Sequence, residues 1–211
     1  MCPGHLRLPL TCAALGLVIN AGPLLGQQEQ RNGFGFSGSL GWSTIGGDYG
    51  DLITSGIPGE GSIWYQPSWW RVGVSIHVAS YDVVEPFSSE SISQVEFQLF
   101  GTFLFLRGNL FQPYAQVRAG TTRWRPEGPI FDPNPPPPDV PPGENPAPGR
   151  DGFQGGLVIG SEFWVTKNFG IDVGGLFSAF STEDLDVPIL GITGLSSGSE
   201  LGFRVGVVWF P

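Results

Sequence analysis

The fold of this chain is decided by residues 70–79, which read WRVGVSIHVA. From Trp70 to Val78 every second residue is large and apolar, and the residues between them are charged, polar or small. A period of two is typical of a β-strand that presents one apolar face. Seven further segments repeat the pattern, so the sequence predicts an all-β protein.

The predicted strands are joined by connections of alternating length. We expect strands at residues 33–43, 60–66, 69–81, 93–106, 110–124, 152–165, 169–181 and 198–210. Short turns fall at 67–68, 107–109 and 166–168, and long loops at 44–59, 82–92, 125–151 and 182–197. Short turns at one end and long loops at the other describe an up-and-down antiparallel sheet. Eight such strands are enough to close a barrel in which the first strand pairs with the last.

Composition indicates which face of this barrel points outward. Of the 211 residues, 40% are hydrophobic and 14% are charged, against roughly 25% charged in ordinary soluble domains. The face opposite the apolar one carries mostly Gly, Ser, Thr and Gln, which suit a narrow interior better than a soluble exterior. The strands also exceed the roughly 9–11 residues that cross a bilayer at a tilt. The sequence therefore predicts an eight-stranded antiparallel up-and-down transmembrane β-barrel with its apolar face toward lipid.

The first 26 residues have the pattern of a secretory signal peptide. Arg7 supplies a positive charge and an apolar run follows at 8–19, shorter than the roughly 20 residues of a spanning helix. A buried N-terminal helix is the alternative interpretation. Cys2 and Cys12 both lie in this segment, so the expected mature chain, 27–211, has no disulfide and no cysteine metal site.

Charge excludes a nucleic-acid partner. The formal net charge is −9, which disfavours electrostatic binding to phosphates. Most carboxylates, including Asp48 and Glu60, fall in the expected long loops, where we expect a solvated acidic surface. Divalent cations held beside lipopolysaccharide phosphates are the alternative.

The loop at 125–151 is rich in proline, with four consecutive prolines at 135–138 and two more at 141–142. Such a sequence favours an extended polyproline conformation or disorder over a sheet. We expect an extracellular loop, which is either an adhesive arm or a variable insertion without function.

Aromatic residues are expected to mark the two membrane interfaces. One ring comes from each strand near the short-turn end: Phe34, Tyr65, Trp70, Phe105, Phe111, Phe163, Phe169 and Trp209. A second row is predicted near the long loops, at Trp42, Tyr81, Trp124 and Phe180. An ordinary aromatic core is the alternative, but a core has no reason to place rings in two rows.

With strand count, loop alternation and aromatic rows in place, the chain resembles the small eight-stranded outer-membrane β-barrels, typified by outer-membrane protein X and the N-terminal domain of outer-membrane protein A. The ending FRVGVVWF at 203–210 is similar to the C-terminal signal that the outer-membrane insertion machinery reads, although Pro211 follows Phe210. The resemblance covers about 27–211. It implies an outer-membrane location, contact with lipid and lipopolysaccharide, recognition of Trp209 and Phe210 by that machinery, and a monomer.

The polar face predicts an ionic network inside the barrel. It carries three basic and three acidic residues: Arg71, Glu96, Arg118, Glu162, Asp172 and Arg204. Buried charges need partners, because an orphan costs several kcal/mol. We place Glu96 near Arg118 toward the long loops. Eight strands leave an interior that side chains fill, so a plug is favoured over an ion path or small channel.

Catalysis is the remaining alternative. Some barrels of this size modify lipid A, and deacylases among them use a His–Ser pair. Here Ser75 and His77 share the inward face, away from an acyl chain in the bilayer, and no orienting acid is evident nearby in the sequence. We therefore expect no enzyme, cofactor or metal, and a structural or surface-interaction role through four extracellular loops.

Overall fold

A computed structural model describes residues 31–83, 91–106, 109–127, 149–187 and 192–211. The elements are β1 (Gly33–Gly47), η1 (Asp48–Asp51), β2 (Ile53–Gln66), β3 (Trp70–Val83), β4 (Ser91–Leu104), β5 (Phe111–Glu127), β6 (Arg150–Trp164), β7 (Phe169–Val187) and β8 (Ile192–Trp209). The expected signal peptide at 1–26 and residues 128–148 of the proline-rich loop lie outside the described residues.

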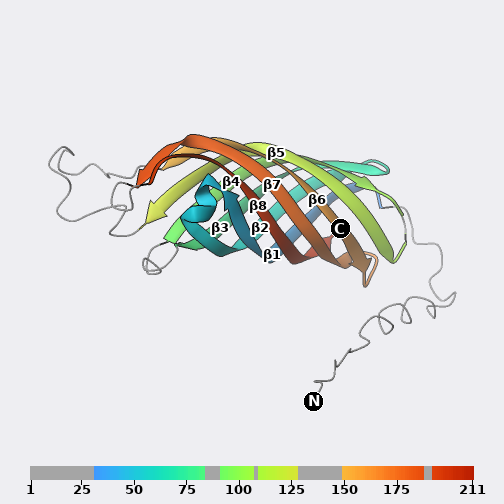
Figure 1. Ribbon diagram of the computed structural model, residues 1–211. Coiled ribbons are helices and arrows are strands. Elements are labelled where there is room, and N and C mark those ends of the chain that lie inside the picture. The colour runs from blue at the N-terminus through green and yellow to red at the C-terminus, as the bar shows by residue number, and fades with distance from the viewer. Residues whose placement is uncertain (1–30, 84–90, 107–108, 128–148, 188–191) are drawn as a thin grey trace, which may run out of the picture.

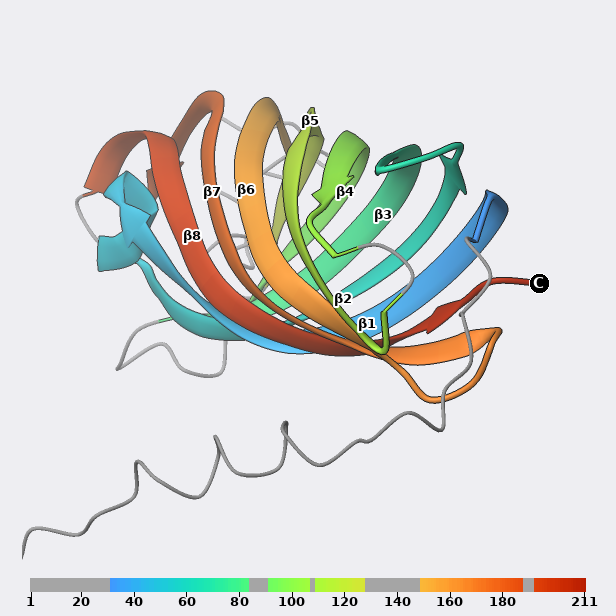
Figure 2. The ribbon, with the colours of Figure 1, turned by 90° about the vertical axis from the view of Figure 1, so that its right-hand side faces the viewer.

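The eight strands form one closed antiparallel barrel. Each strand pairs with its sequence neighbours, and β1 closes the sheet against β8 from Phe36 opposite Trp209 to Gly47 opposite Gly198. Figures 1 and 2 show the tilted strands wrapped around one axis, with the C-terminus at one end and η1 at the other. The predicted fold class is confirmed. No helix in the described part of the chain is long and apolar enough to cross a membrane.

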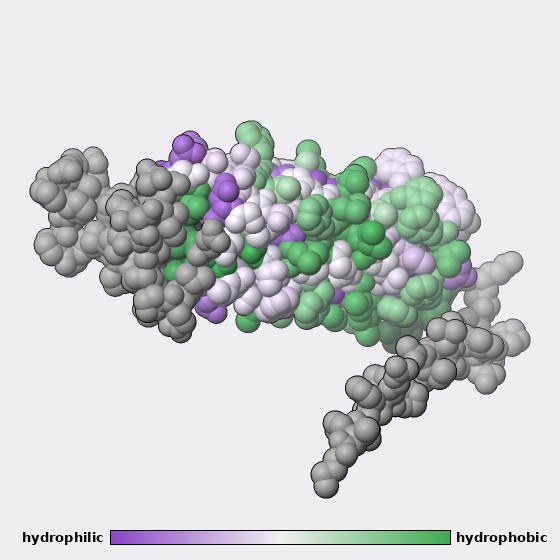
Figure 3. Space-filling model, viewed as in Figure 1, coloured by the Kyte–Doolittle hydropathy of each residue, from purple (hydrophilic) through white to green (hydrophobic). Residues whose placement is uncertain are grey.

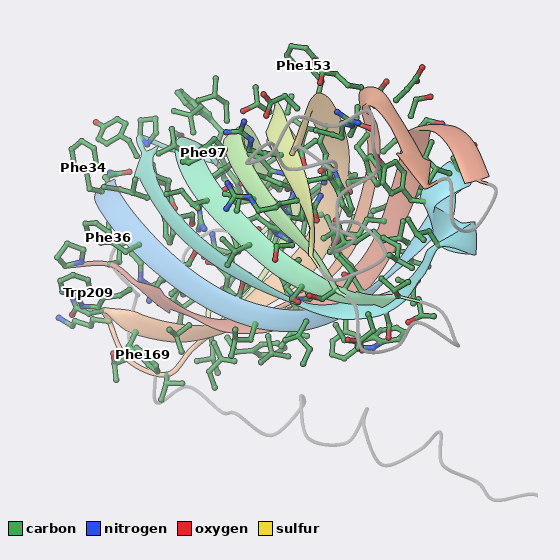
Figure 4. All side chains as sticks on the ribbon, turned by 90° about the vertical axis from the view of Figure 1, so that its left-hand side faces the viewer. Phe34, Phe36, Phe97, Phe153, Phe169 and Trp209 are labelled. Carbon is green, nitrogen blue, oxygen red and sulfur yellow. The ribbon has the colours of Figure 1, made fainter. Side chains whose placement is uncertain are left out.

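The apolar face of the barrel is its outer surface. Along β3, Trp70, Val74 and Val78 are 45–48% exposed, whereas Arg71 and His77 between them are 5% and 2% exposed. Figure 3 shows hydrophobic side chains spread over the visible outer face, and the labelled rings in Figure 4 point away from the barrel. The nine residues from Trp70 to Val78 match the roughly 9–11 that cross a bilayer.

Beyond this apolar band the strands continue toward the long loops with a polar exterior. On β3, Ser80 and Asp82 follow Val78 on the outer face and are exposed. On the neighbouring outer wall, Arg123 of β5 and Asp151 of β6 form an ion pair at 3.1 Å with side chains 58% and 67% exposed. On β3, β5 and β6 the apolar band therefore ends below these polar residues, here called the polar stalk, whereas Ile57 of β2, which pairs with Ser80, is apolar and 69% exposed.

Several strands are longer than predicted, so most of the expected loops 44–59 and 182–197 is strand: β1 runs to Gly47, β7 runs to Val187 and β8 begins at Ile192. The largest extension is in β2. β2 begins at Ile53 rather than near residue 60, because residues 56–60 pair with β1 on one side and β3 on the other. Gly56, Pro58 and Gly59 weaken the local strand signal, but pairing on both edges overrides local propensity. Glu60, expected in a solvated loop, therefore lies within the barrel wall.

Two apolar clusters lie inside the barrel, one toward each end. The cluster at the long-loop end, here called the upper cluster, comprises Ile45, Tyr49, Leu52, Ile53, Ala79, Tyr81, Val83, Ile92, Trp124, Phe180 and Leu195. The cluster at the short-turn end, the lower cluster, comprises Trp64, Phe100, Trp164, Val208 and Phe210. Polar side chains fill much of the space between the two clusters.

The predicted second row of interface aromatics is mostly wrong. Trp42 is 44% exposed on the outer face, but Tyr81, Trp124 and Phe180 are 0–4% exposed and belong to the upper cluster. The reason is the alternation itself: each of the three has the inward parity of its strand, as His77 shows for Tyr81. Trp124 packs on Phe180 and Tyr81 with ring centroids 4.7 and 5.6 Å away.

Candidate functional site

The polar core between the two clusters is the candidate functional site. The structure places all six predicted network residues in the lumen, from Glu96 at 0% to Arg71 and Arg118 at 5% exposure, with the Arg204 side chain at 13%. They come from β3 to β8, so their proximity depends on closure of the barrel.

Arg71 and Glu162 form one part of this core. Arg71 donates from Nη1 and Nη2 to the two oxygens of Glu162 at 2.5 and 3.0 Å. Its Nε donates to Gln66 at 3.2 Å, and its guanidinium lies 4.9 Å from the centroid of the Trp64 ring. The two buried charges therefore balance each other, as a buried ion pair requires, and the guanidinium stacks on the lower cluster.

A second part joins two arginines through Glu60. Arg118 and Arg204 donate to its two carboxylate oxygens at 2.8 and 2.7 Å. Arg204 also lies 3.3 Å from Asp172 and donates to the hydroxyl of Tyr114 at 3.1 Å. Glu60 is thus the hub of the network, and not a residue of a solvated loop as predicted.

The third part surrounds His77 and departs from expectation. Glu96 was grouped with Arg118, yet it accepts hydrogen bonds from Gln94 at 2.5 Å and from Gln98, whereas Arg118 bonds to Gln98 and Glu60. The intervening amide of Gln98 separates the two charges. Glu200 is not among the predicted site residues, although its even number places it on the same inward face of β8 as Arg204.

Among the described residues, Ser75 and His77 are not hydrogen-bonded to each other. Both are buried, at 4% and 2% exposure, and neither the Ser75 hydroxyl nor either ring nitrogen of His77 has a hydrogen-bond partner among the described residues. The two side chains face the lumen between the closing clusters, where an acyl chain in the bilayer does not reach.

The predicted girdle at the short-turn end lies on the outer surface. Its eight rings are 39–61% exposed, and neighbours touch along the barrel, such as Phe34 with Tyr65 at 5.2 Å between centroids and Phe111 with Phe163 at 5.1 Å. Figure 4 shows Phe34, Phe169 and Trp209 gathered at one end of the barrel. Such a row is the expected arrangement at a membrane interface.

At the loop end, outside the membrane band, Asp48 of η1 is tied to β8. Its Oδ2 accepts hydrogen bonds from the hydroxyl and the backbone N–H of Ser197 at 2.8 and 3.2 Å. These bonds favour the ionised carboxylate and lower the pKa of Asp48. The contact fastens η1 beside the upper cluster.

Comparison with known proteins gives the fold a context. No family model and no curated protein matches the sequence. The structure is similar to that of Neisserial surface protein A, with 15% identity, a TM-score of 0.57, and coverage of 87% of this chain and 100% of that one. Outer membrane protein OprG from Pseudomonas aeruginosa matches at 13% identity and a TM-score of 0.46, over 85% of this chain and 98% of that one. The likeness to Neisserial surface protein A agrees with the predicted eight-stranded barrel fold.

Proposed function

We propose that the protein is an integral outer-membrane barrel with a structural and surface-interaction role, whose lumen does not conduct ions. The observation that supports this proposal is the presence of a buried apolar cluster inside each end of the barrel. Trp124 is 0% exposed in the upper cluster and Trp164 is 1% exposed in the lower one. Between them Arg71, Arg118 and Arg204 form ion pairs with Glu60, Glu162 and Asp172, which would oppose the passage of ions.

The four connections at the rim that carries η1 are the proposed interacting parts; 128–149 is the longest, whereas 48–52 and 188–191 are short. All follow strand ends at the same rim, and the strands raise that rim above the apolar band by the polar stalk at Ser80 and Asp82. A rigid stalk with loops at its tip is a common way to present a binding surface, since loops carry function on rigid scaffolds.

The partners follow from the two surfaces. The apolar band and its girdle would contact outer-membrane lipid and lipopolysaccharide, and the barrel would act as a monomer. Trp209 is 49% exposed on the outer face and Phe210 packs into the lower cluster, so this ending would be available to the insertion machinery before the barrel closes. No catalytic role is proposed, because Ser75 and His77 are enclosed.

Planar-bilayer recording tests the closed lumen. We expect the folded full chain to give no steady conductance, while a large porin inserted under the same conditions does. A reproducible ohmic current that scales with the number of inserted barrels would overturn the proposal.

Deletion of residues 130–146 tests the loop role separately. We expect the shortened protein still to differ in gel mobility before and after boiling, as folded barrels do. Whole cells that carry it should lose the adhesion to surfaces that the full chain gives them. Unchanged adhesion after deletion of each long loop in turn would contradict a surface-interaction role.

A further inference from the structure

The central lumen contains two carboxylates that its arginines leave unpaired. The arginines of the core form ion pairs with Glu60, Glu162 and Asp172. Among the described side chains, Glu96 and Glu200 form no ion pair with an arginine, and both are 0% exposed. An uncompensated buried charge costs several kcal/mol, so this pair of carboxylates needs a positive counterpart.

Hydrogen bonds fix both carboxylates but supply no charge. Glu96 accepts from two side-chain amides and Glu200 from two hydroxyls, at 3.1 Å for each hydroxyl. These donors are Gln94, Gln98, Tyr81 and Ser178. Neutral donors that orient acidic side chains are typical of the groups that surround metal ligands.

His77 completes the cluster. Its side chain is 2% exposed, and neither ring nitrogen has a hydrogen-bond partner among the described residues. Nε2 lies 3.9 Å from Glu200 Oε1, which is too far for a hydrogen bond. Nδ1 lies 3.9 Å from Glu60 Oε2, on the side where a carboxylate commonly orients a metal-bound imidazole.

We propose that His77, Glu96 and Glu200 bind one divalent transition-metal ion of the zinc class inside the barrel. One ligand atom from each residue lies within 4.8 Å of the others, so a small contraction brings all three to the roughly 2.0–2.2 Å of Zn²⁺ ligation. One imidazole and two carboxylates are a donor set that zinc accepts. The ion's charge of +2 offsets the two carboxylates, and the unpartnered imidazole nitrogen becomes one of its ligands.

The closed lumen determines how the ion is loaded. The clusters around Trp124 and Trp164 cover the site at both ends, so the metal enters while the barrel folds and exchanges slowly afterwards. In this position it ties β3, β4 and β8 together at mid-lumen, as Arg71 and Glu162 tie β3 to β6 lower down. This inference goes beyond the proposed surface role and does not depend on it.

Refolding with metal tests the site. Full-length chain without an affinity tag is refolded into detergent with Zn²⁺, passed over a chelating resin, and measured by elemental mass spectrometry alongside the gel-mobility test of folding. We expect about one zinc per folded chain, retained in excess chelator and released on boiling. H77A, E96Q and E200Q should each lower this to below about one tenth per folded chain.

The matched control is S75A, which removes a buried hydroxyl two residues from His77 but outside the cluster and should keep the zinc. If a cluster variant fails to fold, the folded wild type refolded with Co²⁺ still decides the question. Visible absorption bands of a four-coordinate site support the proposal. Wild-type protein that folds without stoichiometric zinc and gives no cobalt bands would show that protons, not a metal, balance Glu96 and Glu200. Zinc retained in folded H77A would overturn the proposed ligand set.

Discussion

Arg71 of β3 and Glu162 of β6 meet through two hydrogen bonds inside the barrel, at 2.5 and 3.0 Å. These strands are not neighbours in the sheet, so the pair links two separated parts of the wall across the lumen. Both side chains are almost fully buried, at 6% and 2% exposure. The barrel is therefore stabilised by charged side chains in its interior as well as by its closed hydrogen-bond ladder.

Breaking this pair on one side should be costly. We expect E162Q to lower the free energy of unfolding by about 3–5 kcal/mol, because the Arg71 charge stays buried without its partner. Equilibrium unfolding in urea from detergent micelles measures the change. The double variant R71M/E162M should lose less than the sum of the two single variants.

Arg123 and Asp151 provide the matched control for that experiment. Their pair lies on the outer surface with side chains 58% and 67% exposed. We expect R123M to change the free energy of unfolding by less than about 1 kcal/mol. An equal loss in R123M and E162Q would mean that burial does not set the strength of these pairs.

The position of the membrane band can be tested on a single strand. Val74 lies midway along the apolar face of β3, and Ser80 lies on the same face above the band. We expect V74R to destabilise the barrel in lipid vesicles by about 2–4 kcal/mol, and S80R by about 0–1 kcal/mol. Similar costs at the two positions would contradict a bilayer boundary between Val78 and Ser80.

Much of the architecture is predictable from the sequence because strand alternation is a local signal. The alternation of residues around Val74 shows which side chains point inward and which point outward, without any knowledge of the neighbouring strands. The same alternation also predicts that Tyr81 lies inside the barrel, because Tyr81 has the parity of His77. The prediction of an interface row relied on the position of the rings near strand ends and not on that parity. Tyr81, Trp124 and Phe180 were therefore predicted on the outer face, although they lie inside.

The hub of the ionic core was not predictable in the same way. Glu60 follows Pro58 and Gly59, which interrupt the local pattern, and only pairing with Ser39 and His77 on the two adjacent strands makes the segment a strand. Which arginine bonds to which carboxylate depends on the stagger of the closed barrel. That stagger is a property of all eight strands together and is not visible in any one of them.

The hydrogen bonds from Ser197 to Asp48 predict a pH effect outside the membrane. They lower the pKa of Asp48, so the contact is complete above the unfolded pKa of an aspartate and is lost as pH falls through the lower folded value. In S197A we expect the carboxyl titration, followed by carbon NMR, to move upward. S199A, on the same strand, should leave it in place; an unchanged titration in S197A would show that the hydroxyl does not stabilise the ionised form.

The contact between Gly35 and Trp64 determines how closely the lower cluster packs against the barrel wall. The two residues face each other on β1 and β2, and a Cβ added at Gly35 would lie 2.6 Å from two atoms of the Trp64 ring. We expect G35A to destabilise the barrel by about 1–3 kcal/mol, because the buried ring has to shift.

A smaller residue at position 64 should relieve that clash. In a W64L background, G35A should cost clearly less than in the wild type, which a double-mutant cycle of unfolding free energies detects. G38A is the control on the same strand, since a Cβ there has nothing within 4 Å. It should be neutral or stabilise by up to about 1 kcal/mol. Equal costs for G35A with and without Trp64 would mean that the backbone, and not the ring, requires glycine at this position.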